Sequence, residues 1–289
     1  MSADLQYFEP NYINEALVVL DRFGARARAL AGGTRLGPVL RADRGDVVAL
    51  VNLKRIPALA GITVDEGRLR IGALATAADL ACSPEIAAAA PLVAAAAASM
   101  GSRQLRALAT LGGNICSGDP ASDLTVALLA SDAMCVLASL DHSEFRRPLR
   151  DVLVPGGTTF APAELLVAVE VPVTSVRTAY RKMMTRRGFE MAVVAVAVAI
   201  EDDASMRGAT RIALAGAGPM CQRAAKAESF ARGAPPNADE RGWAKRVAEI
   251  AAADDAAPET DDRASAEYRR HLVTVLAERA LIAALAGRR

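Results

Sequence analysis

The sequence has few aromatic residues, few histidines and almost no excess of charge. Aromatic residues make up 4% of the chain, histidine occurs twice, and 34 Lys and Arg balance 33 Asp and Glu to a formal net charge of +1. The densest basic cluster is Arg181-Lys182 with Arg186-Arg187. A protein that binds nucleic acid usually concentrates basic residues on one face. We therefore expect no nucleic-acid partner.

Cysteine is sparse and scattered, at positions 82, 116, 135 and 221. These residues form no CxxC pair and no Cys/His spacing typical of a metal site, and the ligands of an iron–sulfur cluster are normally closely spaced. We expect no bound metal. The thiols are typical of buried or bystander residues in a reducing compartment.

Long hydrophobic runs are also missing. Ile86–Ala98 is interrupted by Pro91, and Met191–Ile200 is short; crossing a bilayer takes roughly 20 apolar residues. The N-terminus has no basic flank followed by an apolar core, so no signal peptide is expected. Together with the reducing compartment that the thiols suggest, the short apolar runs and the missing signal peptide predict a cytoplasmic protein without a membrane span.

The 289 residues, 52% of them hydrophobic and 23% charged, are enough for about two folded domains. A mixed pattern of helices and strands is expected up to a boundary near Val173–Arg177, after which two buried strands precede three helices. The expected helices are 12–23, 36–41, 124–129, 221–231, 238–252 and 265–286, and the expected strands are 25–30, 47–53, 69–72, 133–138, 164–172, 191–200 and 210–214.

Two segments rich in glycine suggest phosphate binding. Gly32-Gly33 follows an expected strand and precedes an expected helix, where glycine lets the backbone and its N–H groups approach a phosphate. A tight structural turn explains this pair equally well. Leu108–Gly118 is expected to be a loop, from which Thr110 and Asn114 reach phosphate oxygens.

Where this second segment continues to residue 123, Asp119 or Asp123 is expected to accept hydrogen bonds from a ribose. An ordinary polar loop, with Asp123 capping the next helix, is the alternative.

Two common nucleotide motifs are absent. The Walker A spacing occurs at Gly113–Gly118, but Asp119 stands where the motif needs lysine, and its charge would repel a phosphate. The dinucleotide pattern GxGxxG begins at Gly216-Ala-Gly218 but lacks its third glycine, and Pro219 removes an N–H donor. We interpret the segment that begins at Gly216 as a turn.

Taken together, the motifs resemble the FAD-binding middle subunit of the molybdenum hydroxylases, the family of carbon monoxide dehydrogenase and xanthine dehydrogenase. The similar segments are Ala31-Gly32-Gly33-Thr34-Arg35-Leu36, Leu50-Val51-Asn52-Leu53 with Ile56-Pro57-Ala58-Leu59, Thr110-Leu-Gly-Gly-Asn114, Pro120-Ala-Ser-Asp123, Tyr180-Arg-Lys182, Arg211-Ile-Ala-Leu, Arg223-Ala-Ala-Lys-Ala-Glu228 and Tyr268-Arg-Arg-His-Leu-Val. They span nearly the whole chain.

The resemblance implies an α+β protein. Its FAD-binding domain, of the vanillyl-alcohol-oxidase type, would cover residues 1–175 in two subdomains, about 1–58 and 59–175, and a small α+β domain would cover 176–289. It also implies a subunit that passes electrons from the iron–sulfur clusters of a 2Fe-2S small subunit through FAD to an external acceptor. A molybdopterin-binding large subunit would oxidise the substrate. No catalytic residue is expected in this chain.

The resemblance also assigns residues to the cofactor. Positions Ala29, Leu30, Ala31, Gly32, Gly33, Thr34, Arg35 and Leu36 are expected to wrap the pyrophosphate mainly with backbone amides, with Thr110, Gly113 and Asn114 on its other side. Asp123 is expected toward the ribose, and Met100 and Leu166 against the cofactor. Lys182, or Arg181 beside it, is expected near the isoalloxazine ring. Arg35 departs from the small or acidic residue often found in the family.

Simpler roles stay open. Leu166 would then be a core residue, Lys182 a solvated charge, and Tyr180 a half-buried strand residue instead of a ring stacked on the flavin. No His or Cys lies in the first loop, so non-covalent FAD is expected. Two rival functions are a scaffold subunit that has lost FAD and a stand-alone flavin reductase of the same fold. The substrate of the complex and the electron acceptor are not encoded in these motifs.

Overall fold

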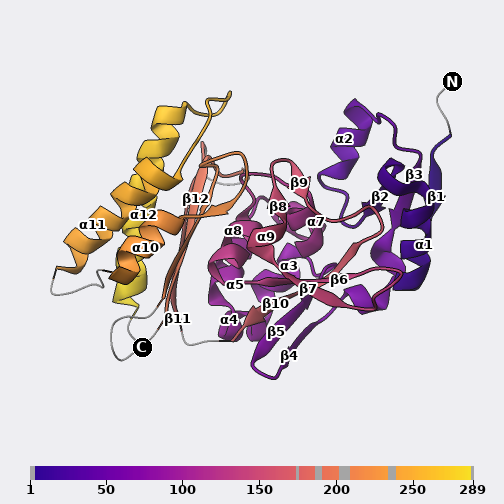
Figure 1. Ribbon diagram of the computed structural model, residues 1–289, viewed down its shortest axis with the longest axis horizontal. Helices are drawn as coiled ribbons and strands as arrows, with labels where there is room; N and C mark the ends of the chain where they lie inside the picture. Colours follow the sequence, from indigo (N-terminus) through magenta and orange to yellow (C-terminus); the bar gives the residue numbers. More distant parts are fainter. Residues whose placement is uncertain (1–3, 174–175, 186–190, 202–208, 234–238, 288–289) are drawn as a thin grey trace.

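The computed structural model describes residues 4–173, 176–185, 191–201, 209–233 and 239–287. Three parts follow one another along the long axis of the molecule, from the N-terminal end to the helices near the C-terminus (Figure 1). Each part has its own sheet. None of the helices in these ranges combines the length and the apolar character that a bilayer span requires.

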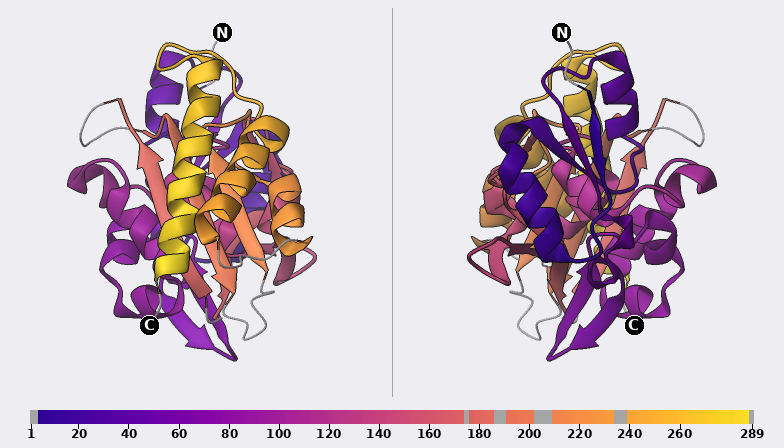
Figure 2. Two further views of the ribbon diagram at one scale, coloured as in Figure 1. Left: turned by 90° about the vertical axis from the view of Figure 1, so that its left-hand side faces the viewer. Right: turned by 90° about the vertical axis from the view of Figure 1, so that its right-hand side faces the viewer.

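The first part is a small parallel sheet with one covering helix. Its strand order is β1 (Gln6–Phe8), β3 (Ala49–Asn52) and β2 (Ala27–Leu30). Helix α1 (Ile13–Phe23) lies against the sheet (Figure 2, right) and buries Ala16, Leu17 and Leu20, which are spaced for one helix face. Helix α2 (Leu36–Ala42) follows β2 after the first glycine pair and buries no residue. Short 3-10 turns occupy 24–26, 53–55 and 57–59.

The second part is an antiparallel sheet covered by short helices. The strand order is β4 (Ile62–Asp65), β5 (Arg68–Gly72), β10 (Leu165–Pro172), β6 (Met134–Ala138) and β7 (Phe145–Pro148). The helices are α3 (Ala77–Cys82), α4 (Pro84–Ala89), α5 (Pro91–Ser99), α6 (Arg103–Arg106), α7 (Leu111–Cys116), α8 (Asp123–Ala130) and α9 (Leu149–Val152), and β8 (Leu153–Val154) pairs with β9 (Gly157–Thr158).

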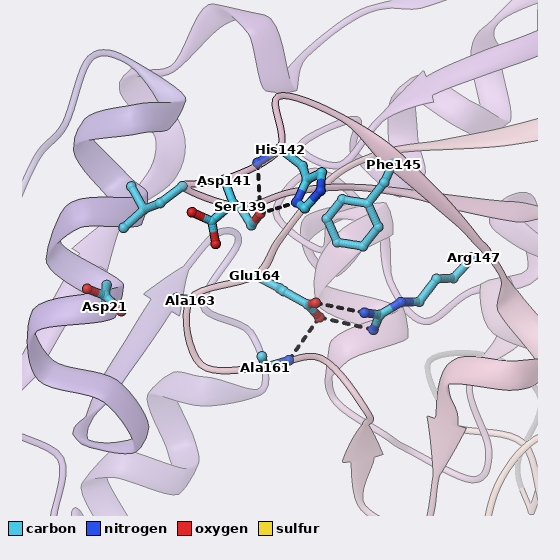
Figure 3. A pocket seen from close by; sticks show the side chains of 10 residues that line it. Asp21, Ser139, Asp141, His142, Phe145, Arg147, Ala161, Ala163 and Glu164 are labelled. Atoms are coloured by element: carbon cyan, nitrogen blue, oxygen red, sulfur yellow. Dashed lines mark hydrogen bonds and ion pairs between the residues drawn. The ribbon is translucent and has the colours of Figure 1, made fainter.

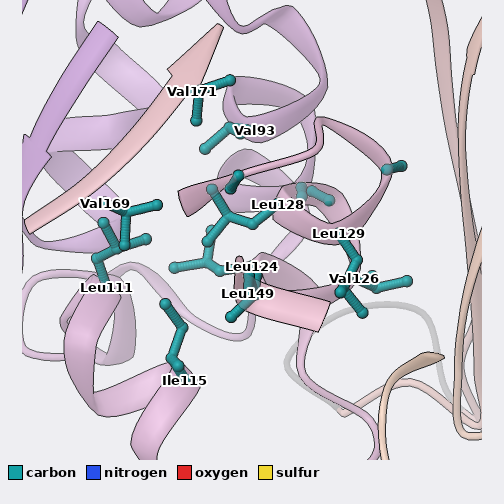
Figure 4. Close-up of a cluster of buried hydrophobic side chains, with 14 of the residues drawn as sticks. Val93, Leu111, Ile115, Leu124, Val126, Leu128, Leu129, Leu149, Val169 and Val171 are labelled. Carbon is teal, nitrogen blue, oxygen red and sulfur yellow. The ribbon is translucent and has the colours of Figure 1, made fainter. Parts of the chain in front are cut away.

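Helix α8 lies at the centre of the molecule. All of its residues are buried, including the polar Asp123 and Thr125, and the other six are apolar. Leu124 and Leu128 pack in one cluster with Leu111 of α7 and Val169 of β10 (Figure 4). The helix also contacts β12 and β13 of the third part. It therefore links the second and third parts through a continuous core.

The third part is a four-stranded antiparallel sheet between α8 and the C-terminal helices (Figure 1; Figure 2, left). The order is β11 (Val176–Met183), β12 (Val194–Glu201), β13 (Thr210–Ala215) and β14 (Gln222–Arg223). Helices α10 (Ala225–Gly233), α11 (Glu240–Ile250) and α12 (Ala266–Ala286) cover the outer face, and a π turn over Ala251–Asp255 continues α11.

Strand β12 is buried on both faces, and its side chains alternate in size. Its alanines, at 195, 197 and 199, belong to the core that contains α8. Its valines, at 194, 196 and 198, belong to the core under α10, α11 and α12. Successive side chains of a strand point to opposite faces, so the small residues allow α8 to approach closely while the larger ones fill the helical side.

Most expected elements are present, and several parts of the chain differ from the expectation. The expected loop at 108–118 contains helix α7, because Thr110 caps it by accepting a hydrogen bond from the Gly113 N–H. Strand β11 was not expected. The segment expected as helix 221–231 begins instead with β14, and its helix starts at Ala225. Ser122, and not Asp123, is the N-cap of α8.

Candidate cofactor site

The first glycine pair packs directly against the segment that leads into α7. A Cβ on Gly32 would lie 1.8 Å from the backbone oxygen of Leu108, so only glycine permits this approach. Gly33 adopts a φ of +72°, in the region that favours glycine. The two glycine segments, far apart in sequence, thus lie side by side.

The first segment carries backbone donors without a partner. Within the described part of the chain, the N–H groups of Gly32, Gly33, Thr34 and Arg35 make no hydrogen bond, although the carbonyl of Gly33 accepts one from Gly37 at 2.8 Å. Successive unpaired N–H groups in a turn form a concave site for an anion. These donors fit the negatively charged pyrophosphate of a dinucleotide.

The second segment differs, because its backbone donors are already used. Leu111 N–H donates to the carbonyl of Ala75 at 2.9 Å and Gly112 N–H to that of Ala73 at 2.8 Å. Gly113 N–H donates to Thr110 Oγ1 at 3.1 Å. What this segment presents outward is the bare, exposed Cα of Gly113 together with the side chains around it.

A hydrogen-bond network fixes Asn114. Its Nδ2 donates to the carbonyl of Thr110 at 3.0 Å, and its Oδ1 accepts from Ser122 Oγ at 3.2 Å. The Ser122 and Thr125 hydroxyls lie 2.8 Å apart. Buried polar side chains held in this way keep one rotamer. Asn114 therefore helps to hold the second glycine segment in its conformation.

One ion pair joins the two segments. Arg35 places a guanidinium nitrogen 3.9 Å from a carboxylate oxygen of Asp119. The Arg35 side chain is 62% exposed and that of Asp119 only 14%. The other carboxylate oxygen of Asp119 accepts from the Ala121 N–H at 2.9 Å.

A buried polar cluster connects α8 with β11. Lys182 Nζ lies 2.9 Å from Asp123, whose Oδ1 also accepts a hydrogen bond of 2.5 Å from the Tyr180 hydroxyl. Lys182 Nζ is also 3.4 Å from the carbonyl of Ser99, at the end of α5. Burial raises the pKa of Asp123, opposed by the charge of Lys182. Burial, together with the Asp123 charge, raises the pKa of Tyr180 well above its usual range.

The remaining assigned residues are more dispersed. Met100 follows α5 beside this cluster and is half-buried, and its carbonyl accepts from Arg106 at 2.8 Å. Leu166 is 4% exposed and belongs to the central core. Ala29 lies exposed on β2. Lys182, with its side chain 4% exposed, is not a solvated charge.

Sequence reasoning did not foresee the partnership of Lys182 with Asp123. The two residues are 59 positions apart, and no local pattern relates them. The support role of Ser122 was also missed, although a serine directly before a helix is a recognisable N-cap pattern.

A surface hollow lies away from the residues assigned to the cofactor (Figure 3). It measures about 690 Å³ and contains none of the assigned positions; its lining is Asp21, Ser139, Leu140, Asp141, His142, Phe145, Arg147, Ala161, Ala163 and Glu164. Arg147 and Glu164 are paired across its wall at 2.8 Å. Among the described residues, no group of three His, Cys, Asp or Glu side chains is arranged to hold a metal ion.

Two family models together match nearly all of the chain. Residues 3–174 match the FAD-binding domain of molybdopterin dehydrogenases, and residues 178–284 match the C-terminal domain of the carbon monoxide dehydrogenase flavoprotein. The medium chain of carbon monoxide dehydrogenase from Hydrogenophaga pseudoflava is 30% identical, over 97% of this chain and 97% of its own. Subunit alpha of the 6-hydroxypseudooxynicotine dehydrogenase complex of Paenarthrobacter nicotinovorans is also 30% identical, over 96% of this chain and 94% of its own.

The fold agrees with these matches. A solved structure of the Hydrogenophaga pseudoflava carbon monoxide dehydrogenase superposes with a TM-score of 0.90, at 29% identity and 99% coverage of both chains. Fold and glycine segments thus define a flavoprotein with an FAD-binding domain and a C-terminal flavoprotein domain. The chain belongs to the FAD-binding subunit family of the molybdopterin dehydrogenases, a family of oxidoreductase subunits. The resemblance, the α+β fold and the FAD cofactor expected from the sequence are confirmed.

Proposed function

We propose that this chain passes electrons from iron–sulfur clusters of a partner subunit, through its own FAD, to an external acceptor. The observation that carries the proposal is the row of unpaired N–H groups in the first glycine segment, directly beside the second segment. FAD, when bound, supplies the electron chemistry, and the protein supplies its position. No residue of the chain is proposed as a catalytic acid or base.

The two glycine segments have different tasks in this proposal. The N–H groups of the first segment bind the pyrophosphate, with Leu30, Ala31 and Leu36 on either side shaping the turn. Thr110, Gly113 and Asn114 close the opposite side, where the bare Cα of Gly113 leaves room for phosphate oxygens. Ala29 contributes through β2, which leads into the first segment, and Leu166 through the core in which Leu111 of the second segment also packs. Met100 lines the cofactor.

Lys182 and Asp123 act as one unit. We expect Lys182 to approach the flavin ring and Asp123 to face the ribose side while they remain paired. Arg181 is exposed and its guanidinium donates to the carbonyl of Tyr180, which favours Lys182 as the residue near the cofactor. The domains proposed for this arrangement are 1–175, with subdomains of about 1–58 and 59–175, and 176–289.

The proposed partners are a molybdopterin-binding large subunit and a 2Fe-2S small subunit. Their support is that similar proteins are named as chains or subunits of complexes. Lys182 is buried against Asp123, so it does not take part in any docking by the basic cluster. Arg181 stays available at the surface, while Arg186 and Arg187 lie outside the described residues. A cytoplasmic location remains part of the proposal.

The test is cofactor retention by the purified full chain. We expect one FAD per chain, released completely by acid or heat because it is held non-covalently. Gly113→Val should abolish retention without unfolding the chain. Gly157→Val is the matched control, since Gly157 lies in strand β9 with open space around it.

Three outcomes would contradict parts of the proposal. A folded wild-type chain that never binds FAD would favour the scaffold role. Stoichiometric FAD in Gly113→Val would show that the second segment is wrongly assigned. Turnover of a defined substrate with NADPH by the isolated chain would favour a stand-alone reductase.

A further inference from the structure

The ion pair between Arg35 and Asp119 lies where the cofactor phosphates are proposed to bind. Arg35 belongs to the row of residues with unpaired N–H groups. Its guanidinium reaches over to Asp119, which follows α7 in the second segment. The only positive side chain of the first segment thus faces an acidic side chain of the second across the proposed phosphate site.

The two partners differ in how firmly they are held. Asp119 is fixed: one carboxylate oxygen accepts from the Ala121 N–H at 2.9 Å, and its backbone carbonyl accepts from the Ser122 N–H at 3.1 Å. Arg35 is 62% exposed, and the separation of 3.9 Å is longer than a hydrogen bond. Exposed ion pairs of this kind are weak. Arg35 is therefore the partner that is able to move.

We propose that Arg35 is a phosphate-binding residue of this chain, for whose guanidinium Asp119 and the FAD pyrophosphate compete. The inference rests on the proposed FAD site. A guanidinium binds phosphate with two parallel N–H donors, and a charge-assisted bond of this kind is stronger than a long exposed pair with a carboxylate. Asp119 then acts as a competitor that weakens FAD binding.

The competition predicts opposite effects for the two residues. Removing the guanidinium in Arg35→Ser should raise the dissociation constant for FAD about tenfold, through loss of a charge-assisted hydrogen bond. Asp119→Asn keeps the acceptor for the Ala121 N–H but removes the charge. It should lower the dissociation constant about threefold, the scale of one exposed ion pair.

The experiment measures FAD binding to the full-length apoprotein by quenching of flavin fluorescence at several salt concentrations. Arg35→Ser should also make binding less sensitive to salt, because one phosphate contact is lost. In the Arg35→Ser background, Asp119→Asn should give a smaller gain than in the wild type, since only the direct repulsion between the carboxylate and the phosphates is then removed. Arg41→Ser, which removes an exposed charge from α2, is the control and should stay within about twofold of wild type.

The results distinguish a failure of the proposed Arg35 role from a failure of the FAD site itself. If Arg35→Ser binds FAD like the wild type, or if Asp119→Asn weakens binding, the proposed phosphate binding by Arg35 is wrong while the FAD site stands. The same holds if Asp119→Asn acts equally with and without Arg35. If the wild-type chain itself binds no FAD, the proposed function fails, and this inference fails with it.

Discussion

Lys182 on β11 and Asp123 at the start of α8 form a buried ion pair, with Nζ 2.9 Å from the carboxylate and both side chains less than a tenth exposed. The pair joins the third part of the molecule to the second. Tyr180 Oη and the Ser99 carbonyl complete its hydrogen bonds. A buried pair of charges is tolerated only when its remaining donors and acceptors are satisfied in this way.

Removing one partner of this pair should destabilise the chain strongly. Lys182→Met leaves the Asp123 carboxylate buried without its cation, for which we expect a loss of about 3–5 kcal/mol in the free energy of unfolding. Arg181→Met is the control, because Arg181 is exposed, and it should cost less than about 0.5 kcal/mol. Urea unfolding measures both. Equal effects of the two variants would contradict a stabilising role of the pair.

Glu170 should make the chain sensitive to acid. This residue is 4% exposed on β10, and Arg146 binds it with hydrogen bonds of 2.9 and 2.8 Å, helped by Arg70 at 3.2 Å. The Arg146 hydrogen bond lowers the pKa of Glu170 below its ordinary value of 4.5. A lowered folded-state pKa gives stability that is complete above the unfolded-state pKa and is lost as the pH falls through the folded-state pKa.

The pH dependence of Glu170→Gln tests this assignment. Wild-type stability should fall progressively below about pH 4.5, and the variant, although less stable at neutral pH, should show a shallower fall in that range. Urea unfolding at pH 7, 5, 4 and 3 gives the comparison. Parallel curves for both proteins would show that Glu170 does not contribute to the acid sensitivity.

Gly32 should tolerate no side chain. In Gly32→Ala, the new Cβ would overlap the Leu108 carbonyl oxygen, so the two glycine segments must separate. We expect a loss of about 1–3 kcal/mol, as for other overpacked sites, together with weaker FAD retention. Gly37→Ala, whose Cβ meets nothing within 4 Å, should change stability by less than about 0.5 kcal/mol. Thermal unfolding and the flavin-to-protein absorbance ratio distinguish the two, and normal behaviour of Gly32→Ala would refute the close packing.

Arg269 should be essential for the C-terminal helices. Its guanidinium donates to the Val193 carbonyl at 2.6 Å, to the Gly216 carbonyl at 3.2 Å and to Asp261 at 2.6 Å, while its side chain is 5% exposed. Arg269→Met leaves these acceptors without a donor and should cost about 3 kcal/mol or more. The exposed neighbour Arg270, changed to Met, should have little effect. Chemical unfolding of both variants is the measurement, with a similar midpoint for both as the contrary result.

The amino-acid sequence by itself determined the local elements and the two glycine segments. Helices such as α1 and α12 follow from apolar periodicity, and the buried strand β12 follows from an uninterrupted apolar run, since hydrogen bonds and side-chain spacing within a few residues decide them. The α+β class and the FAD cofactor followed from motifs of similarly short range, recognised as a resemblance to a family.

Only the tertiary structure decided which distant groups meet. Helix α7 replaced an expected loop because its first N–H groups donate to the carbonyls of Ala73 and Ala75, some forty positions earlier in the chain. The pairing of Lys182 with Asp123 and the approach of Gly32 to Leu108 likewise require whole sheets and helices to pack first. Such contacts depend on burial and on the geometry of the assembled core, which no local pattern of residues contains.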